Sequence, residues 1–329
     1  MLTADIIRRV KEIQVRTGRH VADVLAGEYV CVFRGAGIEF DEVRPYQPGD
    51  DVRCIDWNVT ARAGSPYVKR YVEERQLTLM LMADISASQD FGSAGRSKRE
   101  ASAELCALLA FSAIRNDDKV GLVLFHSQVQ QYIPPRKGQK HALRVVREVL
   151  AHGADDGADD AAGAGAPAIP ISQRFSQRLQ ALLPGRRPRP PRQGTDIANA
   201  LEFVLSVNKR RSVCFVVSDF LDDGFEGALS RANRRHDIVA VLITDPRELA
   251  IPGVGVVSLT DAETGRSELH DTSSGAFRQT LERRAEDRVA ALRTRLERRG
   301  IDLIHIDASA SVVEPLVRFF KQREAKTRR

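Results

Sequence analysis

The clearest signal along the chain is a set of short apolar runs separated by amphipathic stretches. Residues 77–86 read LTLMLMADIS, a nearly continuous apolar run that ends in polar residues. Such a run is typical of a strand buried on both faces, as in a parallel sheet. Further strands are predicted by the runs at 120–125, 212–217, 238–243 and 301–306. Apolar residues at helical spacing predict helices at 98–115, 139–150, 196–206, 227–235, 277–296 and 312–320.

This alternation of strands and helices predicts the fold class. Parallel neighbouring strands need crossover connections, so the chain is expected to form an α/β domain with a doubly wound, mostly parallel sheet of Rossmann-like type. A short edge strand is predicted at 127–133, and a hairpin at 253–259 and 266–270. Sheets of this kind bind ligands at the carboxyl ends of their strands, where the strand order reverses.

Two regions lie outside this pattern. Residues 1–75 begin with a stretch of helical periodicity and continue with many turn-forming residues, so they predict a smaller N-terminal accessory unit of helix, loops and short strands. Residues 76–329 form the main domain, which carries a low-complexity insertion at 153–193. The insertion starts acidic, predicts a short helix at 172–183, and ends in the stiff basic run PGRRPRPPR at 184–192.

Composition narrows the classes of function. The 329 residues are 43% hydrophobic, enough for one large core and a smaller unit. The net charge of +6 is spread along the chain, and no aromatic residues interleave with the basic run, which disfavours nucleic-acid binding. Neither a signal peptide nor an apolar stretch of membrane-spanning length is recognisable, so a cytoplasmic protein without a membrane span is expected.

Cysteine usage and overall composition add two smaller expectations. None of the four cysteines forms a CxxC pair, which disfavours zinc, and Cys106 and Cys214 are expected to be buried thiols in a reducing compartment. The abundance of Arg and Ala points to a bacterial source.

Oxygen-bearing side chains cluster where predicted strands end. Asp84, Ser86 and Ser88 alternate in the loop after the first run, while Thr195 precedes a helix and Asp219 follows an apolar strand. In a doubly wound sheet these loops meet, and hard oxygen donors suit Mg²⁺, with Mn²⁺ or Ca²⁺ as alternatives. Taken singly, each of these residues is explained as well by helix capping or by a hydrogen bond within its loop.

The order DxSxS, then Thr, then Asp resembles the metal-ion-dependent adhesion site of von Willebrand factor A domains over about residues 77–320. The resemblance implies that Ser86, Ser88 and Thr195 contact the metal directly or through water, while Asp84 and Asp219 hold coordinating waters. It implies an open coordination position for an acidic group of a partner. Asp196, next to Thr195, is expected to be structural.

Residues 33–75 carry a second resemblance, to the domain-of-unknown-function-58 family of bacterial proteins. The matching residues are Gly37, Glu39, Phe40, Arg44, Tyr46, Pro48 to Asp51, Arg53, Ile55 to Trp57, Ala61, Arg62 and Lys69. Two later stretches, 245–248 and 261–265, also resemble this family. The resemblance implies a MoxR-type AAA+ ATPase as partner, in a chaperone-like or cofactor-inserting system.

The acidic residues of this N-terminal segment have two readings. Asp50, Asp51 and Asp56 alternate with arginines, which predicts a structural lattice of ion pairs more than a second metal or hydrolytic site. Trp57, the only tryptophan, is predicted to anchor the segment on the main domain.

The sequence therefore predicts a metal-dependent protein-binding module that is not an enzyme. The alternative is a Mg²⁺-dependent hydrolase or phosphotransferase that uses the same carboxylates. Such enzymes need a nucleophilic Asp or a two-metal carboxylate cluster, which the loop does not supply. No GxxxxGK[ST] loop is present, and His126 and His305 at strand ends are expected to be structural.

Overall fold

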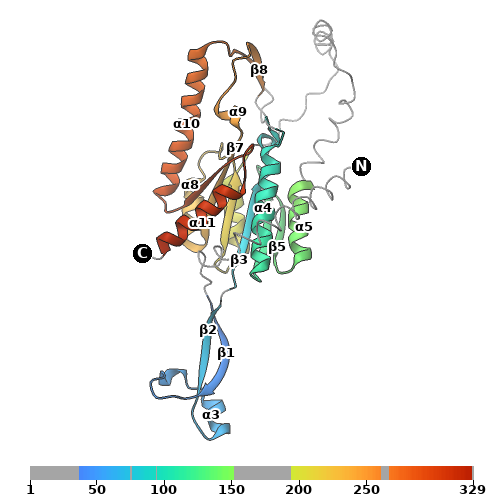
Figure 1. The fold of residues 1–329 in the computed structure, drawn as a ribbon. Helices are drawn as coiled ribbons and strands as arrows, with labels where there is room; N and C mark the ends of the chain where they lie inside the picture. The colour runs from blue at the N-terminus through green and yellow to red at the C-terminus, as the bar shows by residue number, and fades with distance from the viewer. Residues whose placement is uncertain (1–36, 75, 94, 152–193, 261–266, 328–329) are drawn as a thin grey trace.

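The computed structural model describes residues 37–74, 76–93, 95–151, 194–260 and 267–327 (Figure 1). The predicted helical stretch at the N-terminus, the insertion with its helix at 172–183 and basic run, and the turn of the predicted hairpin lie outside these residues.

A six-stranded sheet forms the centre of the protein, in the order β10-β7-β6-β3-β4-β5. Its strands are β3 (Thr78–Asp84), β4 (Lys119–Phe125), β5 (Val129–Arg136), β6 (Val213–Ser218), β7 (Asp237–Thr244) and β10 (Asp302–Asp307). Every neighbouring pair is parallel except β4 and β5. The predicted doubly wound, mostly parallel α/β fold is therefore confirmed.

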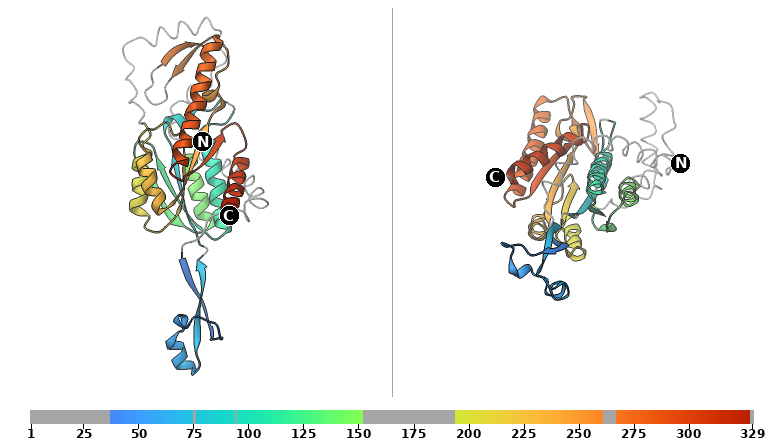
Figure 2. Two further views of the ribbon diagram at one scale, coloured as in Figure 1. Left: turned by 90° about the vertical axis from the view of Figure 1, so that its left-hand side faces the viewer. Right: turned by 60° about the horizontal axis from the view of Figure 1, so that its bottom comes forward.

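Helices cover both faces of this sheet (Figures 1 and 2). One face packs against α4 (Lys98–Arg115), α5 (Gln139–Ala151) and α11 (Val313–Thr327). The other packs against α7 (Ile197–Val207), α8 (Glu226–Arg235) and α10 (Gly275–Glu297). Alternation along β3 explains the two layers, because successive side chains of a strand point to opposite faces. Leu79 and Leu81 belong to the first core, and Met80 and Met82 to the second.

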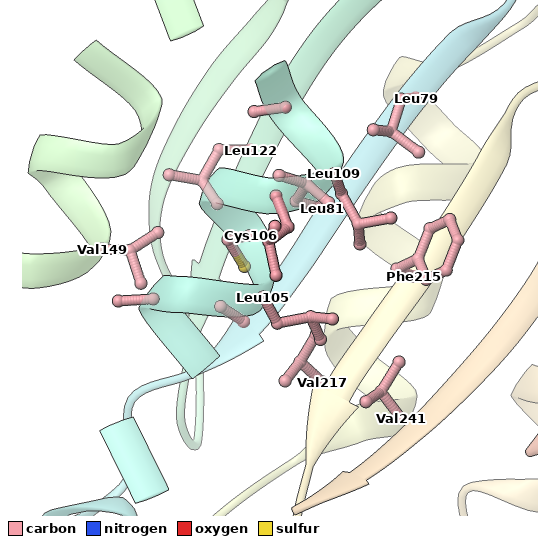
Figure 3. Close-up of a cluster of buried hydrophobic side chains, with 14 of the residues drawn as sticks. Leu79, Leu81, Leu105, Cys106, Leu109, Leu122, Val149, Phe215, Val217 and Val241 are labelled. Atoms are coloured by element: carbon pink, nitrogen blue, oxygen red, sulfur yellow. The ribbon is translucent and has the colours of Figure 1, made fainter. Parts of the chain in front are cut away.

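The core under α4 shows how this packing is built (Figure 3). Leu105, Cys106 and Leu109 of the helix are fully buried against strand residues such as Leu81 and Phe215. Truncating one such leucine to alanine typically costs roughly 2–5 kcal/mol. Cys106 and Cys214 are buried free thiols, as predicted, and burial raises the pKa of each thiol to about 12.

The edge strand β5 and the hairpin were both expected. β5 carries Pro134 and Pro135, which is tolerated because an edge strand can lack amide donors on its open side. The hairpin consists of β8 (Val256–Thr260) and β9 (Ser267–Asp271), which pair antiparallel. A short helix, α9 (Pro246–Leu249), connects β7 to this hairpin.

A separate N-terminal arm, residues 37–74, extends from the sheet edge at which β3 begins (Figures 1 and 2). β1 (Gly37–Pro45) and β2 (Tyr67–Glu74) form a two-stranded antiparallel sheet. The far end carries η2 (Val52–Cys54) and α3 (Trp57–Ala63). The proposed division of the chain into an accessory unit at 1–75 and a domain at 76–329 stays a prediction.

The predicted anchoring of Trp57 is wrong. Its side chain is 70% exposed, because it occupies the first position of α3 at the end of the arm that lies away from the sheet. Within the described residues, no helix combines the length and the apolarity needed to cross a membrane.

Candidate metal site

The predicted site lies where two adjacent strands send their connections to opposite faces. β3 pairs directly with β6, and both are parallel. After β3 the chain enters α4 on one face, whereas after β6 it enters α8 on the other. Connections that separate in this way leave a crevice at the carboxyl ends of the strands. The loops after β3 and β6 therefore lie at this switch point, and Asp84 with the polar side chains around it makes up what is called the Asp84 crevice.

Asp84, the last residue of β3, is the centre of the polar contacts in this crevice. Its side chain is almost fully buried. Oδ1 accepts a hydrogen bond from the backbone N–H of Ser86 at 2.8 Å. Oδ2 accepts from Ser218 Oγ at 2.7 Å and from Thr195 Oγ1 at 3.3 Å. One carboxylate thus joins the loop after β3, the segment before α7 and the end of β6.

The two serines of the loop face each other. Ser86 Oγ lies 3.0 Å from Ser88 Oγ, and both side chains are buried. Ser86 precedes the 3-10 helix η3 (Ala87–Asp90), but its hydroxyl makes no capping hydrogen bond. Its hydroxyl is therefore not used in the way that a capping role would require.

Thr195 is half-buried and precedes α7. The neighbouring Asp196 caps this helix by accepting from the Asn199 N–H at 2.8 Å. This confirms the structural role expected for Asp196, and it leaves the Thr195 hydroxyl directed at Asp84.

Asp219 is buried next to Asp84, and its two oxygens differ. Oδ2 accepts from the Lys98 ammonium at 2.8 Å, whereas Oδ1 has no hydrogen-bond partner among the described residues. Burial, together with the negative charge of Asp219, raises the pKa of Asp84 to about 6. The crevice is therefore short of positive charge near Asp84 and has an unused buried carboxylate oxygen.

These residues fit a hard divalent cation. The available donors are all oxygens, namely two carboxylates and three hydroxyls, as Mg²⁺ or Mn²⁺ prefers. Among the residues that the structure describes, no three His, Cys, Asp or Glu side chains form a metal-binding group. A cation here would thus depend on hydroxyls, with Ser86, Ser88 and Thr195 beside Asp84 and Asp219. Whether they act as ligands stays a prediction.

Three residues of the crevice were not predicted from the sequence: Ser218, Lys98 and Glu248. Ser218 bonds to Asp84, and Lys98 bridges Asp219 and Glu248 of α9, with 2.6 Å from its Nζ to Glu248 Oε1. Burial lowers the pKa of Lys98, but the two carboxylates outweigh this effect and the net shift is upward. Ser218 adjoins Asp219 in the sequence and could have been found. Lys98 gave no signal, because a lysine in the first turn of a helix is usually solvated.

The acidic residues of the N-terminal arm have structural roles, as predicted. Asp50 forms a two-pronged ion pair with Arg44 at 2.9 and 2.6 Å. Asp51 caps η2, and Asp56 caps α3 and lies 3.3 Å from the Lys69 ammonium. These two ion pairs and two helix caps favour structural roles over a second metal site. Among the described residues they do not form the predicted lattice, since Arg44 is the one arginine that pairs with these aspartates.

The two histidines at strand ends also have local partners. His305 Nε2 lies 2.9 Å from Thr244 Oγ1 on the neighbouring strand β7. His126 Nδ1 lies 2.9 Å from the hydroxyl of Ser127. Both contacts agree with the structural roles expected for these residues.

Comparison with the sequence profiles of known protein families shows which family this chain belongs to. The sequence profile of the family described as "Protein of unknown function DUF58" matches residues 42–291. The chain belongs to this family. The match begins within β1 and ends within α10, so it includes most of the arm and every loop of the candidate site in this DUF58 protein.

This DUF58 protein is similar to bacterial relatives in sequence and to several solved structures. An uncharacterized protein from Mycobacterium tuberculosis is 29% identical over 257 residues, which cover 78% of this chain and 70% of the relative. Among solved structures, the conserved hypothetical protein BatB from Bacteroides thetaiotaomicron is 17% identical with a TM-score of 0.41, covering 76% of this chain and 99% of BatB. The SpRpn10 VWA domain is 14% identical with a TM-score of 0.35, covering 74% of this chain and 93% of that domain.

Proposed function

We propose that this DUF58 protein binds a divalent cation, Mg²⁺ in the first place, in the Asp84 crevice and uses it to bind a protein partner. The observation that carries the proposal is the convergence of three loops on Asp84 beside the unused oxygen of Asp219. In this proposal the chain is a binding protein and not an enzyme.

The chemistry of the donors supports binding over catalysis. Hydroxyls are neutral, so an ion held by Ser86, Ser88 and Thr195 keeps much of its positive charge. Such an ion favours an acidic side chain as a further ligand. A Mg²⁺-dependent hydrolase would instead need a nucleophilic carboxylate or two metals. Asp84 is poorly suited as a nucleophile because both of its oxygens already accept hydrogen bonds.

The partner that we propose presents an acidic residue to the ion. The resemblance of the arm to its family implies a MoxR-type AAA+ ATPase as that partner. An acidic side chain of the ATPase, or of a client of the ATPase, would then coordinate the cation that this DUF58 protein holds.

The first test is cation binding by the purified protein. We expect Mn²⁺, titrated by isothermal calorimetry or by its EPR signal, to bind one site in the wild type. Asp84→Ala and Ser86→Ala should each lose this binding while keeping the circular dichroism of the fold. Asp223→Ala, which removes an exposed carboxylate from the loop between β6 and α8, is the matched control and should bind normally.

The second test addresses the partner. The purified MoxR-type ATPase encoded by the same organism should be retained by the immobilised wild type in Mg²⁺ and released by EDTA. Asp84→Ala should not retain it, and Asp223→Ala should. Retention that is unchanged in EDTA would contradict the proposal. Hydrolysis of a phosphate ester that requires Asp84 would favour the enzyme instead.

A further inference from the structure

Among the described residues, the ammonium of Lys98 is unusual because it is fully buried. This residue is the first of α4, and its side chain has no exposed surface. The amino end of a helix carries a partial positive charge, so a lysine in its first turn is unfavourable there. Removing an ammonium from water costs several kcal/mol as well. A position with two such penalties requires compensating interactions from its surroundings.

Two carboxylates provide this compensation. Lys98 Nζ lies 2.8 Å from Asp219 Oδ2 and 2.6 Å from Glu248 Oε1. Glu248 belongs to α9, and its carboxylate also accepts from the Asp245 N–H through Oε2 at 3.2 Å. The ammonium is thus fixed between the candidate site and α9.

Because of Lys98, a metal ion in the crevice would have to share the Asp219 carboxylate with an ammonium. Its ammonium occupies Oδ2, and only Oδ1 is left for a metal ion or for water bound to that ion. An oxygen pair that already shares its charge with an ammonium attracts a second cation less strongly. The ammonium also repels any divalent ion in the same crevice.

The charges in the crevice support this view. Asp84, Asp219 and Glu248 are three carboxylates, and among the described residues Lys98 is the one ammonium that pairs with Asp219 and Glu248. Replacing Lys98 by a neutral residue would make the crevice more negative. Replacing Lys98 and Glu248 together would leave its net charge unchanged.

We propose that Lys98 is a resident counter-cation that weakens divalent-ion binding at the Asp84 crevice, so that the ion binds firmly only together with the carboxylate of a partner. This inference rests on the proposed function and identifies what regulates the affinity of that same site. A weakly held ion retains the charge with which it attracts an acidic ligand.

The test is a Mn²⁺ titration of the purified full-length protein without any partner. We expect Lys98→Met to bind Mn²⁺ at least about tenfold more tightly than the wild type, since charge in a buried crevice is poorly screened. Lys98→Met with Glu248→Gln should return the affinity to near the wild-type value. Lys137→Met removes an exposed ammonium that pairs with Asp117, and this control should change nothing.

Glu248→Gln alone keeps the proposal testable if Lys98→Met does not fold. This variant retains the ammonium and removes a partly exposed negative charge, so Mn²⁺ binding should weaken by about tenfold. Folded variants in which Lys98→Met binds no more tightly, or Glu248→Gln binds no more weakly, would overturn the inference and make Lys98 a structural residue.

Failure of the proposed function has a different signature. If Mn²⁺ binds the wild type and Asp84→Ala abolishes that binding, the cation site stands, and the Lys98 variants decide only the inference. If neither the wild type nor Lys98→Met binds Mn²⁺ in an Asp84-dependent manner, the cation site and the inference both fail.

Discussion

Buried aspartates occur at both ends of the central strands. Asp84 lies at the carboxyl end of β3, and Asp118 precedes β4 at the opposite edge of the sheet. Asp118 accepts a hydrogen bond from the Leu77 N–H at 2.7 Å. Burial outweighs this hydrogen bond and raises the pKa of Asp118 to about 6. The charged form of Asp118 therefore costs stability in the folded protein.

A prediction follows for the pH dependence of stability. Because its folded pKa is raised, Asp118 holds its proton better in the folded chain between about pH 4 and about pH 6, so the free energy of unfolding falls as pH rises through this window. Asp118→Asn should be more stable than the wild type by about 1–2 kcal/mol at pH 7 and should show no gain near pH 4. Urea unfolding at the two pH values, without added metal, measures the difference. Asp223→Asn, at an exposed position in the loop after β6 at the opposite end of the sheet, is the control, and an equal gain there would contradict the assignment.

Ser218 is the residue whose hydroxyl connects β6 to Asp84. It donates to Asp84 Oδ2 at 2.7 Å and accepts from the Phe220 N–H at 3.1 Å. Ser218→Ala should lower the free energy of unfolding by roughly 1.5–3 kcal/mol, because a buried carboxylate loses a donor. Ser206→Ala removes an exposed hydroxyl and should stay within about 0.5 kcal/mol of the wild type. Similar losses in the two variants would show that the Asp84 contact adds little.

The five predicted site residues show what sequence reasoning can reach at this scale. Each bears an oxygen and lies next to a predicted strand or helix end, so their convergence followed from the fold class. Lys98 was out of reach, since its burial depends on Asp219 and Glu248, which lie more than a hundred positions later in the chain. Trp57 was misplaced because an aromatic side chain is usually buried, whereas this one lies at the end of the arm.

Among the elements, the N-terminal arm depends most on local contacts. Val68 is the only buried hydrophobic residue of its described side chains, and a two-stranded sheet is marginally stable in water. Helix capping and ion pairs therefore contribute a large share of its order. Asp56 is central, because it accepts from the N–H groups of Asn58 and Val59 at the start of α3.

Removing this cap should affect the arm and leave the sheet intact. In Asp56→Ala, the loss of an N-cap costs about 1 kcal/mol, so amide hydrogens at 57–63 should exchange faster. Asp56→Asn, which retains a capping oxygen, should exchange nearly as the wild type does. Amides of β3 and β6 should be unchanged in both variants. Faster exchange throughout the sheet would mean that the arm and the main domain unfold together.

Elements of the sheet were easier to predict than those of the arm. The strands β3, β4, β6 and β7, which are buried on both faces, and the edge strand β10 all have apolar runs, and most of the helices have a clear period. β5 was predicted at 127–133 but extends to Arg136, since paired prolines usually end a strand and are accommodated here at an open edge. Short strands were expected within residues 1–75, but the positions of β1 and β2 were not predicted. The apolar alternation of β1 is interrupted by a bulge between Phe40 and Glu42, and the apolar residues of β2 come in adjacent pairs.

At the scale of the whole molecule, the order of the strands in the sheet could not be predicted from the sequence. β3 pairs with β4, which follows it, and also with β6, more than a hundred positions later, and no local pattern encodes the second pairing. The class of fold restricts the possible orders, but the packing of both faces selects one of them. The candidate site depends on this selection, since it needs β3 and β6 side by side.

The chain segments before and after the insertion therefore each contribute part of the same central sheet. A first piece, 1–151, contains β3, β4 and β5, and a second piece, 194–329, contains β6, β7 and β10. Leu79 to Ala83 pair with Val213 to Val217 across the division, and each piece alone would expose this buried seam to water. Co-expressed with a tag on one piece, the two pieces should purify together, and recovery of the tagged piece alone as a soluble monomer would contradict this.

Ion binding would then report the reassembly. Asp84, Ser86 and Ser88 belong to the first piece, while Thr195 and Asp219 belong to the second. Neither piece contains a full set of oxygen donors, so Mn²⁺ should bind only after the pieces have joined. The ion site would serve as an internal sensor of whether the two halves of the sheet have met.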